Sequence, residues 1–595
     1  MILYSLIYMI LLLLGESLSE DRLDIHEVDG SGYTVVKEDT ERLQKTIYTS
    51  MYEMSKFFER EKQYIEDIQT VIDKKLVDME TQGSFGAYLA SYEDIVGLQD
   101  DSDEAFLNNP LNAYNLIRHV AVGWNVVESS IQRYKEKHPG QLPKRVRKLL
   151  SRSKREHLPG AEDLDGASTA LVRLHEYYNF NITSFVEEGV IETKDGERFE
   201  TTGELSVWDI FKIGVKGTNM MILGSGIEIM SHGLAKAKRD GLVTTPPFVD
   251  SHDFKTLKNI VKTAKTVHDQ KLDRWGPLTP THSTNYVPYD KRLAKKKKFN
   301  KVVSEKMILN NPSIIDTIQE TKQYRKLCNG EELRSPDVLK DLTCRYEHRG
   351  LPYYRYGPHK IETVSLRPHI VIIHDFISDE ITKEFINSAS PNLKRSAMRG
   401  FKNGTNAVDD RRVSEQSWIN EEVPAARKLT DQINDYLNLL VDSSIHSELY
   451  QVANYGTAGH YSSHYDQVLM GSSPNDLERR NIFNIKTGDR MATIMGYLSD
   501  VEEGGYTVFP MVGAYIKPKK GSIVLWWNMD DAGGYDMLTR HGGCPVLIGS
   551  KWITNKWVRI NSQMFKRPCP KYTGKQIRQF RNNANFQRGG WISDP

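Results

Sequence analysis

Residues 450–467 read YQVANYGTAGHYSSHYDQ, a run of β-branched and aromatic residues that leads, past a glycine-containing turn, to histidines and an aspartate. Short runs of this kind, bounded by Gly, Pro or Asp, are typical of β-strands. Similar runs recur after Cys328, at 369–377, 491–499, 506–510, 521–527 and 551–560. Several short strands with turns between them predict a two-sheet jelly roll, or double-stranded β-helix, whose mouth suits a buried metal.

Two histidines and an aspartate carry the chemistry of this region. His464 and Asp466 are two residues apart, so on an extended chain both side chains leave the same face and can reach one ion. His541, in RHGGCPV, is the candidate third ligand, because its glycines permit close backbone approach before the next strand. Two imidazoles and one carboxylate leave three positions open on a six-coordinate ferrous ion, as in non-heme iron oxygenases. Lys551 is a cation in an otherwise apolar barrel and needs an anion, which the distal carboxylate of 2-oxoglutarate would supply.

The size and charge of the chain limit the possible functions. Its 595 residues exceed what one hydrophobic core organises, so several domains are expected. Lys and Arg number 79 against 78 Asp and Glu, a net charge of +1, and this balance favours neither nucleic acid nor an anionic membrane as partner.

The first residues, MILYSLIYMILLLLGESLSEDR, form an apolar run of signal-peptide length followed by small residues suited to cleavage before Glu20. They predict a signal peptide over 1–19, entry into the secretory pathway and no stable membrane anchor. An uncleaved anchor is the alternative, because no Lys or Arg precedes the apolar run. No KDEL-like signal follows the final WISDP, so residence in the endoplasmic reticulum requires a retained partner, and secretion is the alternative.

The cysteines and two Asn-x-Thr triplets fit an oxidising, luminal compartment. An even number of cysteines there predicts two disulfides among three possible connectivities. The four are Cys328, Cys344, Cys544 and Cys569. We favour the two local pairs, the first cysteine with the second and the third with the fourth. Asn181 and Asn403 are N-glycosylation acceptors if they lie on exposed loops.

An apolar heptad pattern opens the N-terminal part. Its positions are Met51, Phe58, Ile65, Ile72 and Met79, with Ile47, Met54 and Ile68 between them. The pattern predicts a long amphipathic helix with a coiled-coil seam. Glu61 and Lys75 interrupt that seam, so a helix packed within its own domain is the alternative to a dimer contact.

Further helices are predicted downstream. Asn109-Pro110 and the apolar positions behind it indicate a helix that begins just inside the proline. Between 162 and 241, helix-length apolar patterns alternate with breaks, and paired helices of this kind can form a concave peptide-binding surface or a plain spacer. A run of lysines at 295–298 lies in a loop-rich, basic stretch and is best explained as solvated.

The chain resembles the α subunits of collagen prolyl 4-hydroxylases, from the N-terminal helices to the last cysteine. YQVANYGTAGHYSSHYD, RMATIMGYLSDVEEGGYTVFP, PKKGSIVLWWN and RHGGCPVLIGSKWITNKWV follow one another in the family's order, and NPLNAYNLIRHVAVGW and DLDGASTALVRLHEYYNF are similar to its assembly and substrate regions. DIFKIGVKGTNMMILGSGIEIM keeps the start of the family's tetratricopeptide-like peptide-binding domain, but its glycines would weaken the helices by up to roughly 1 kcal/mol each.

The resemblance implies roles for particular residues. It makes the two histidines and the aspartate the iron ligands and Lys551 the residue that binds the 2-oxoglutarate carboxylate, where related lysyl hydroxylases carry arginine. Tyr455 and Thr493 align with positions that hydrogen-bond the same co-substrate. Tyr461 and Trp557 match aromatic positions around the substrate groove, where a ring can pack on proline, although a core role fits both equally well.

The resemblance also implies an activity and partners. A procollagen-proline 4-dioxygenase uses Fe(II), dioxygen and 2-oxoglutarate to hydroxylate proline in X-Pro-Gly sequences, releases succinate and carbon dioxide, and is kept active by ascorbate. Family members pair with protein disulfide isomerase as the β subunit of an α2β2 tetramer in the lumen of the endoplasmic reticulum. The alternatives are a catalytically silent collagen-binding or assembly subunit, a hydroxylase of other proline-rich secreted proteins that present polyproline II chains, and a hydroxylase of lysine or of proline C3.

The sequence therefore predicts a multidomain α + β chain, in which all-helical N-terminal domains precede a C-terminal double-stranded β-helix. The expected division is a signal peptide (1–19), a helical assembly domain (20–140), a helical peptide-binding-like domain (141–250), a basic linker (251–327), a dioxygenase domain (328–575) and a tail (576–595).

Overall fold

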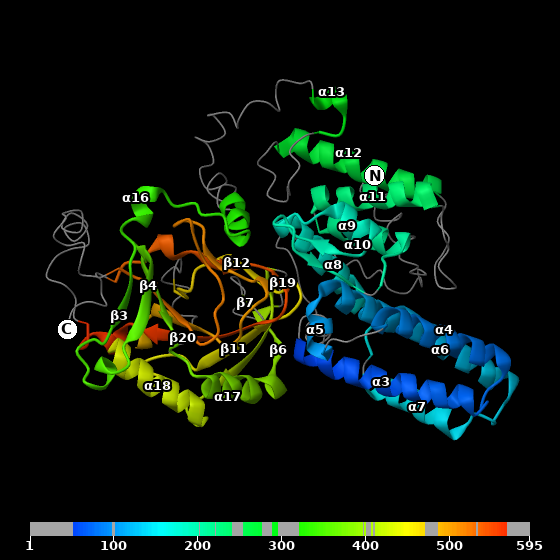
Figure 1. Ribbon diagram of the computed structural model, residues 1–595, viewed down its shortest axis with the longest axis horizontal. Helices are drawn as coiled ribbons and strands as arrows, with labels where there is room; N and C mark the ends of the chain where they lie inside the picture. The colour runs from blue at the N-terminus through cyan, green and yellow to red at the C-terminus, as the bar shows by residue number, and fades with distance from the viewer. Residues whose placement is uncertain are drawn as a thin grey trace. The chain divides into compact units, whose positions relative to one another are not determined.

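The computed structural model describes residues 51–567, except 98–101, 157, 202, 221, 241–253, 276–287, 295–320, 397, 400–405, 408–410, 470–485 and 531–532. It divides into two compact units, 1–319 and 320–595 (Figure 1). The predictions for the signal peptide, the tail, Asn403 and Cys569 lie outside the described residues. Among the helices that the structure describes, none combines the length and the apolar character needed to cross a bilayer.

The first unit is helical, as predicted. Its elements are α3 (Met51–Asp73), α4 (Met79–Val96), α5 (Asp103–Asn108), α6 (Pro110–Lys137), α7 (Lys144–Glu156), α8 (Ala161–Tyr178), α9 (Ile182–Glu187), β1 (Ile191–Glu192), β2 (Arg198–Phe199), α10 (Val207–Asn219), α11 (Leu223–Asp240), α12 (Phe254–Trp275) and α13 (Lys291–Ala294). The helix predicted at the proline is α6: Pro110 occupies its first turn, and the Asn109 side chain accepts a hydrogen bond from the Leu111 amide at 2.9 Å.

The continuous heptad seam predicted through Met79 is wrong. Helix α3 ends at Asp73, and Met79 begins the next helix with 81% of its surface exposed. The buried face of α3 packs on α4, α5 and α7 of the same unit, which is the alternative that the interrupted pattern allowed.

Glu61 interrupts the apolar face of α3 because it has polar partners on other helices. Its side chain is completely buried, and Oε1 accepts a hydrogen bond from the Tyr88 hydroxyl at 2.8 Å. His119 Nε2 lies 3.3 Å from the same oxygen, and His119 Nδ1 lies 3.1 Å from the Ser91 hydroxyl. A buried carboxyl group needs such polar partners, and through the contacts of Oε1 Glu61 links α3 to α4 and α6.

The glycines of α10 and α11 permit a close helix contact. A Cβ at Gly214 would lie 2.8 Å from the Gly226 carbonyl oxygen, and a Cβ at Gly226 would lie 2.6 Å from the Gly214 oxygen. The two backbones therefore touch where each helix lacks a side chain, and this packing offsets the low helix propensity expected of these residues.

The expected linker over 251–327 is partly structured. Helix α12 packs its apolar residues, among them Leu257, Ile260 and Val261, into one core with α10 and α11. Residues 321–328 form a further helix at the start of the second unit. The basic composition of this stretch hid both helices, because lysines occupy their exposed positions.

The second unit contains the predicted two-sheet fold (Figure 1). Its elements are α16 (Pro336–Leu339), β3 (Cys344–Glu347), β4 (His359–Leu366), β5 (His369–His374), α17 (Asp379–Ala389), β6 (Lys394–Arg395), β7 (Met398–Arg399), β8 (Asn406–Ala407), β9 (Arg412–Val413), β10 (Glu415–Ile419), α18 (Pro424–Leu437), β11 (Tyr450–Tyr455), β12 (His460–His464), β13 (Arg490–Tyr497), β14 (Glu503–Gly504), β15 (Thr507–Phe509), β16 (Ala514–Ile516), β17 (Ile523–Trp527), β18 (His541–Gly543), β19 (Val546–Ile548) and β20 (Lys551–Arg559).

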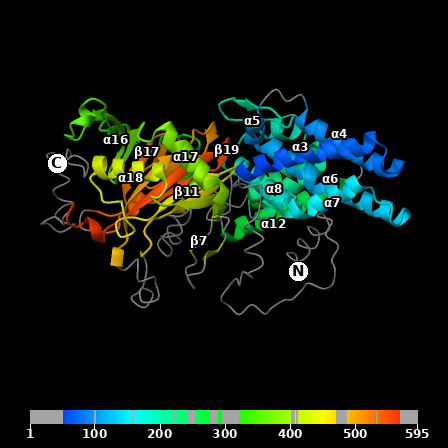
Figure 2. The same cartoon turned by 90° about the horizontal axis from the view of Figure 1, so that it is seen from below.

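A large and a small antiparallel sheet form the barrel. The large sheet has the strand order β3-β4-β5-β17-β13-β20-β11-β10-β6, and the small sheet has the order β16-β15-β18-β12-β9. One apolar core lies between the large sheet and helices α17 and α18, which cross it on one side (Figure 2). A second core, which includes Phe509 of β15 and Trp526 of β17, lies between the two sheets. The side chains that face this second space line the interior of the barrel.

The favoured local pairing of the cysteines is wrong. Cys328 is joined to Cys544, at a sequence separation of 216 residues, while Cys344 is exposed on β3 and forms no disulfide with another described residue. The disulfide ties the helix at 321–328 to the segment between β18 and β19. Tyr324 of the same helix donates a hydrogen bond from its hydroxyl to the Tyr461 carbonyl at 3.1 Å.

Candidate metal centre

The three predicted ligands meet inside the barrel. His464 ends β12, His541 begins β18, and the two residues are direct partners across this strand pair. His464 Nε2 lies 3.8 Å from Asp466 Oδ1, and His541 Nε2 lies 3.7 Å from Asp466 Oδ2. One ligand atom of each residue falls within 4.8 Å of the other two, a spacing at which a single ion can be held. Within the described residues, no other group of three such side chains does so.

Backbone carbonyls fix the tautomer of both imidazoles. His464 Nδ1 lies 2.9 Å from the Ser462 oxygen, and His541 Nδ1 lies 2.9 Å from the Thr539 oxygen. A carbonyl can only accept, so each Nδ1 carries a hydrogen, and each Nε2 is the ring nitrogen that faces Asp466. Metal-binding histidines are oriented in this way.

The protonation states also suit a cation. Burial, followed by the neighbouring His541, lowers the pKa of His464 to about 3, so this imidazole is neutral at physiological pH. Burial opposes ionisation of Asp466, but the imidazoles of His541 and His464 and the guanidinium of Arg490 lower its pKa below the ordinary value. The cluster therefore offers two imidazole nitrogens and one carboxylate, the donor set that suits Fe(II).

Neighbouring side chains hold the ligands in place. The Thr493 hydroxyl donates to Asp466 Oδ2 at 2.6 Å and accepts from Asn528 Nδ2 at 2.9 Å. The Tyr461 ring stacks on His464, with centroids 3.6 Å apart and planes 17° apart. Trp526 meets the His541 ring edge-on at 4.7 Å.

Lys551 lies in the barrel interior at the start of β20. It is 2% exposed, and its ammonium donates to the Gly505 carbonyl at 2.6 Å and to the Thr507 hydroxyl at 3.2 Å. The Tyr497 hydroxyl donates to the same Thr507 oxygen at 2.8 Å. Burial lowers the pKa of Lys551 to about 7, and no carboxylate of the described residues pairs with it. A buried cation without an anion provides a binding position for a carboxylate ligand.

The remaining predicted residues occupy the same interior. Tyr455 is the cross-strand partner of Lys551, and its ring centre lies 5.7 Å from the ammonium. Thr493 has a contact that the sequence did not predict, since its hydroxyl hydrogen is directed to Asp466. Trp557 is buried beneath the Arg490 guanidinium, 3.7 Å from the ring centre. Their contacts with a co-substrate or a peptide remain predictions.

Sequence reasoning missed a buried charge cluster beside the centre. Arg490 donates to both carboxylate oxygens of Glu448 at 2.5 and 2.7 Å, and to the Asp466 carbonyl at 3.2 Å. Arg559 lies 2.7 Å from Glu448 as well. Each member comes from a different strand or loop, and nothing in the sequence spacing could have connected them.

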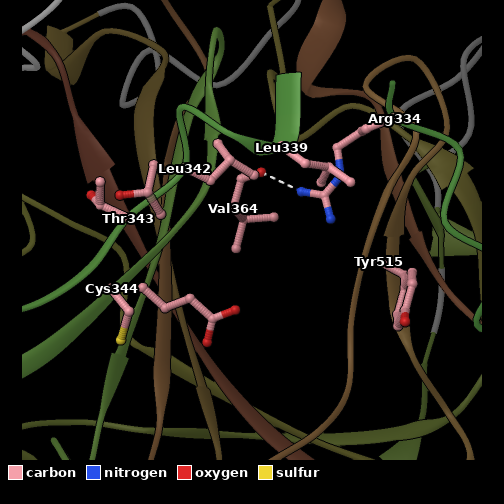
Figure 3. A pocket seen from close by; sticks show the side chains of 9 residues that line it. Arg334, Leu339, Leu342, Thr343, Cys344, Val364 and Tyr515 are labelled. Carbon is pink, nitrogen blue, oxygen red and sulfur yellow. Dashed lines mark hydrogen bonds between the residues drawn. The ribbon is translucent and has the colours of Figure 1, made fainter. Parts of the chain in front are cut away.

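A separate cavity of about 330 Å³ lies elsewhere in the second unit (Figure 3). It is lined by residues of the segment before β3 and by β4, including Arg334, Leu342 and Val364, with Tyr515 on the opposite wall. Neither an iron ligand nor Lys551 lines this cavity, so it is distinct from the centre described above.

Comparisons with known proteins agree with this geometry. Residues 450–559 match the 2OG-Fe(II) oxygenase superfamily, and residues 50–192 match the N-terminal region of the prolyl 4-hydroxylase α subunit. The prolyl 4-hydroxylase subunit alpha-2 of Gallus gallus is 31% identical over 540 residues, which cover 88% of this chain and 95% of that protein. The subunit alpha-2 of Caenorhabditis elegans is 30% identical, with 84% and 90% covered, and the subunit alpha-1 of Homo sapiens is 29% identical, with 88% and 95% covered.

The fold and the site thus define an Fe(II)- and 2-oxoglutarate-dependent dioxygenase. Over most of its length, the chain belongs to the prolyl 4-hydroxylase α-subunit family.

Proposed function

We propose that this chain is a catalytic α subunit that converts proline to 4-hydroxyproline in X-Pro-Gly sequences of procollagen or of another proline-rich secreted polypeptide. The observation that carries the proposal is the combination of an intact set of ligand side chains, His464, Asp466 and His541, with a buried ammonium, Lys551, that lacks an acidic partner among the described residues. A subunit that had lost catalysis would have no need to keep either feature.

The side chains divide the work of the reaction. Bound Fe(II) would supply the redox chemistry that couples decarboxylation of 2-oxoglutarate to hydroxylation, and the two Nε2 atoms with the Asp466 carboxylate would hold it. Lys551 binds the distal carboxylate of 2-oxoglutarate, assisted by the Thr507 hydroxyl. Tyr455 borders this pocket, and the apolar second core around it limits the access of water.

Aromatic side chains beside the metal support proline as the substrate. The Tyr461 ring, which is partly buried and stacked on His464, offers an apolar surface against which a pyrrolidine ring can pack. Trp557 of β20, a buried ring beneath the Arg490 guanidinium, is the second aromatic candidate. We propose that both contribute to binding of an extended peptide.

We further propose that the protein works in the lumen of the endoplasmic reticulum, with ascorbate maintaining Fe(II), and that protein disulfide isomerase is its β subunit in an α2β2 tetramer. The Cys328–Cys544 disulfide supports an oxidising compartment. Asn181 supports a luminal, glycosylated chain, because this residue is exposed at the N-cap of α9.

The test is oxygen-dependent succinate release by the full chain, co-expressed with protein disulfide isomerase, with a (Pro-Pro-Gly) peptide, Fe(II), 2-oxoglutarate and ascorbate. Amino-acid analysis of the peptide separates 4-hydroxyproline from 3-hydroxyproline. We expect peptide-stimulated turnover that His464→Ala abolishes. His374→Ala is the matched control, since His374 lies on β5 and pairs with Glu362 instead of the iron site.

Two outcomes would contradict the proposal. Turnover that yields 3-hydroxyproline would contradict hydroxylation at C4. No turnover by an assembled, iron-loaded complex, together with retained peptide binding, would favour the silent assembly subunit.

A further inference from the structure

Asp489, directly before β13, is a buried carboxylate that belongs to neither the metal ligands nor the co-substrate pocket. It is 3% exposed, and all four of its side-chain contacts are made with hydrogen-bond donors. A buried carboxylate is costly unless its lone pairs are satisfied, so the number and the origin of these donors indicate what the residue holds together.

Two of the donors come from the main chain two and three residues after the metal ligand Asp466. Asp489 Oδ1 accepts from the Val468 amide at 2.8 Å, and Oδ2 accepts from the Leu469 amide at 2.8 Å. These are the second and third residues after Asp466. The carboxylate therefore fixes the main chain that leaves the ligand.

The start of β13 also fixes the ligand itself. The Arg490 side chain donates to the Asp466 carbonyl, and the Asp489 carboxylate accepts from the Arg490 amide at 2.8 Å. Three residues further along the strand, the Thr493 hydroxyl donates to Asp466 Oδ2. The main chain and the carboxylate of Asp466 are thus both positioned from one short stretch of β13.

The fourth donor comes from the segment that leads to the third ligand. The Tyr535 hydroxyl donates to Asp489 Oδ2 at 3.0 Å. The next residue, Asp536, accepts through its carbonyl from the Thr539 amide at 3.2 Å, and the Thr539 carbonyl faces His541 Nδ1. Asp489 is consequently a bridge between the segment that carries the first two ligands and the segment that carries the third.

We propose that Asp489 is a positioning residue for the iron centre. An ionised carboxylate can accept all four hydrogen bonds, whereas the amide of an asparagine would turn two N–H groups toward donors. Metal sites depend on such outer contacts, because a ligand that is free to move loses affinity for the ion.

The test uses the metal-stripped full chain and measures the Kd for Mn²⁺, a redox-inert probe of the same site, by calorimetry. We expect Asp489→Asn to raise this Kd by about 10- to 100-fold, the range typical of outer-shell losses. The KM for Fe(II) should rise with it, while kcat at saturating iron changes less. Tyr535→Phe removes one of the four hydrogen bonds and should raise the Kd about threefold.

Asp500→Asn is the matched control, because Asp500 is an exposed aspartate just beyond β13 that accepts from the Lys520 amide. It should leave the Kd for Mn²⁺ unchanged. If Asp489→Asn has native circular dichroism and a lower Tm but binds Mn²⁺ as tightly as the parent chain, its role is structural and the proposal is overturned. Should that variant fail to fold, Tyr535→Phe decides, and an unchanged Kd for Mn²⁺ overturns the proposal.

Discussion

Replacing Lys551 by methionine tests the co-substrate pocket most directly, because the change removes the charge and keeps most of the volume. The parent ammonium forms a charge-assisted contact with the distal carboxylate of 2-oxoglutarate in a buried position. Truncating one member of such a pair typically costs 2–5 kcal/mol, and a loss of about 3 kcal/mol raises the Kd of 2-oxoglutarate roughly 100-fold.

The affinity of the parent chain for 2-oxoglutarate should also depend on pH. Binding needs the ammonium form of Lys551, and in the free protein the pKa of this group is about 7. The affinity for 2-oxoglutarate is therefore at its maximum well below pH 7, where Lys551 is protonated. Above that value, the Kd rises by about tenfold for each pH unit, until the higher pKa of the complex is reached. The Lys551→Met variant should show no such dependence.

The same substitution should stabilise the protein when 2-oxoglutarate is absent. The pKa of Lys551 is 10.5 in the unfolded chain and about 7 in the folded protein. Between pH 7 and 10.5 the unfolded chain therefore binds more protons than the folded protein. The free energy of unfolding consequently rises with pH over this range. The corresponding net cost of burying the Lys551 ammonium at pH 7 is roughly 4 kcal/mol.

Calorimetry and thermal unfolding at pH 7 measure both effects. Lys556→Met is the control on the same strand: Lys556 is equally buried but pairs with Glu421 at 2.5 Å, so its loss should lower Tm and leave the Kd of 2-oxoglutarate unchanged. If Lys551→Met binds 2-oxoglutarate within threefold of the parent chain, the assignment of this pocket is refuted.

Three further expectations concern stability. Cys328→Ser should lower the free energy of unfolding by about 5 kcal/mol, since the disulfide closes a loop of 216 residues; a non-reducing peptide map that joins Cys328 to Cys344 instead would contradict it. Glu61→Ala should cost about 3 kcal/mol in urea denaturation, because Tyr88 and His119 lose their buried acceptor; a loss below 1 kcal/mol would show that the contacts are worth little. Gly214→Ala should lower the free energy of unfolding by about 2 kcal/mol, and with it Tm, because the new Cβ would lie 2.3 Å from Met230 Cγ. Gly83→Ala should raise Tm, because the position in α4 has open space around it. Equal shifts for the two glycines would refute the close contact of α10 and α11.

The sequence predicts the barrel well because its strands obey a local rule. Each predicted run after Cys328 becomes a strand, from β5 to β20, since β-branched and aromatic residues between turn residues need no distant information. The ligand set is predictable for a similar reason: His464 and Asp466 are close in sequence, and the glycines that follow His541 mark a special position in the chain.

The errors arise where a contact joins distant parts of the chain. Cys328 meets Cys544 because the fold returns β18 to the helix at 321–328, and sequence distance gives no indication of this. In the sequence, Glu61 only interrupts an apolar face. Its polar partners, Tyr88 and His119, lie on other helices and contact it only in the folded protein. Asp489 was not singled out at all, since three of its four donors come from segments whose proximity only the folded barrel establishes.

The pairing of His464 with His541 across β12 and β18 has a consequence for the order of events during synthesis. A nascent chain that has reached β17 already contains two ligands, but the third lies beyond it and comes into place only when β18 adds to the small sheet. Tight capture of iron must therefore wait until the C-terminal strands have left the ribosome. A chain that retains the metal has therefore formed the complete barrel.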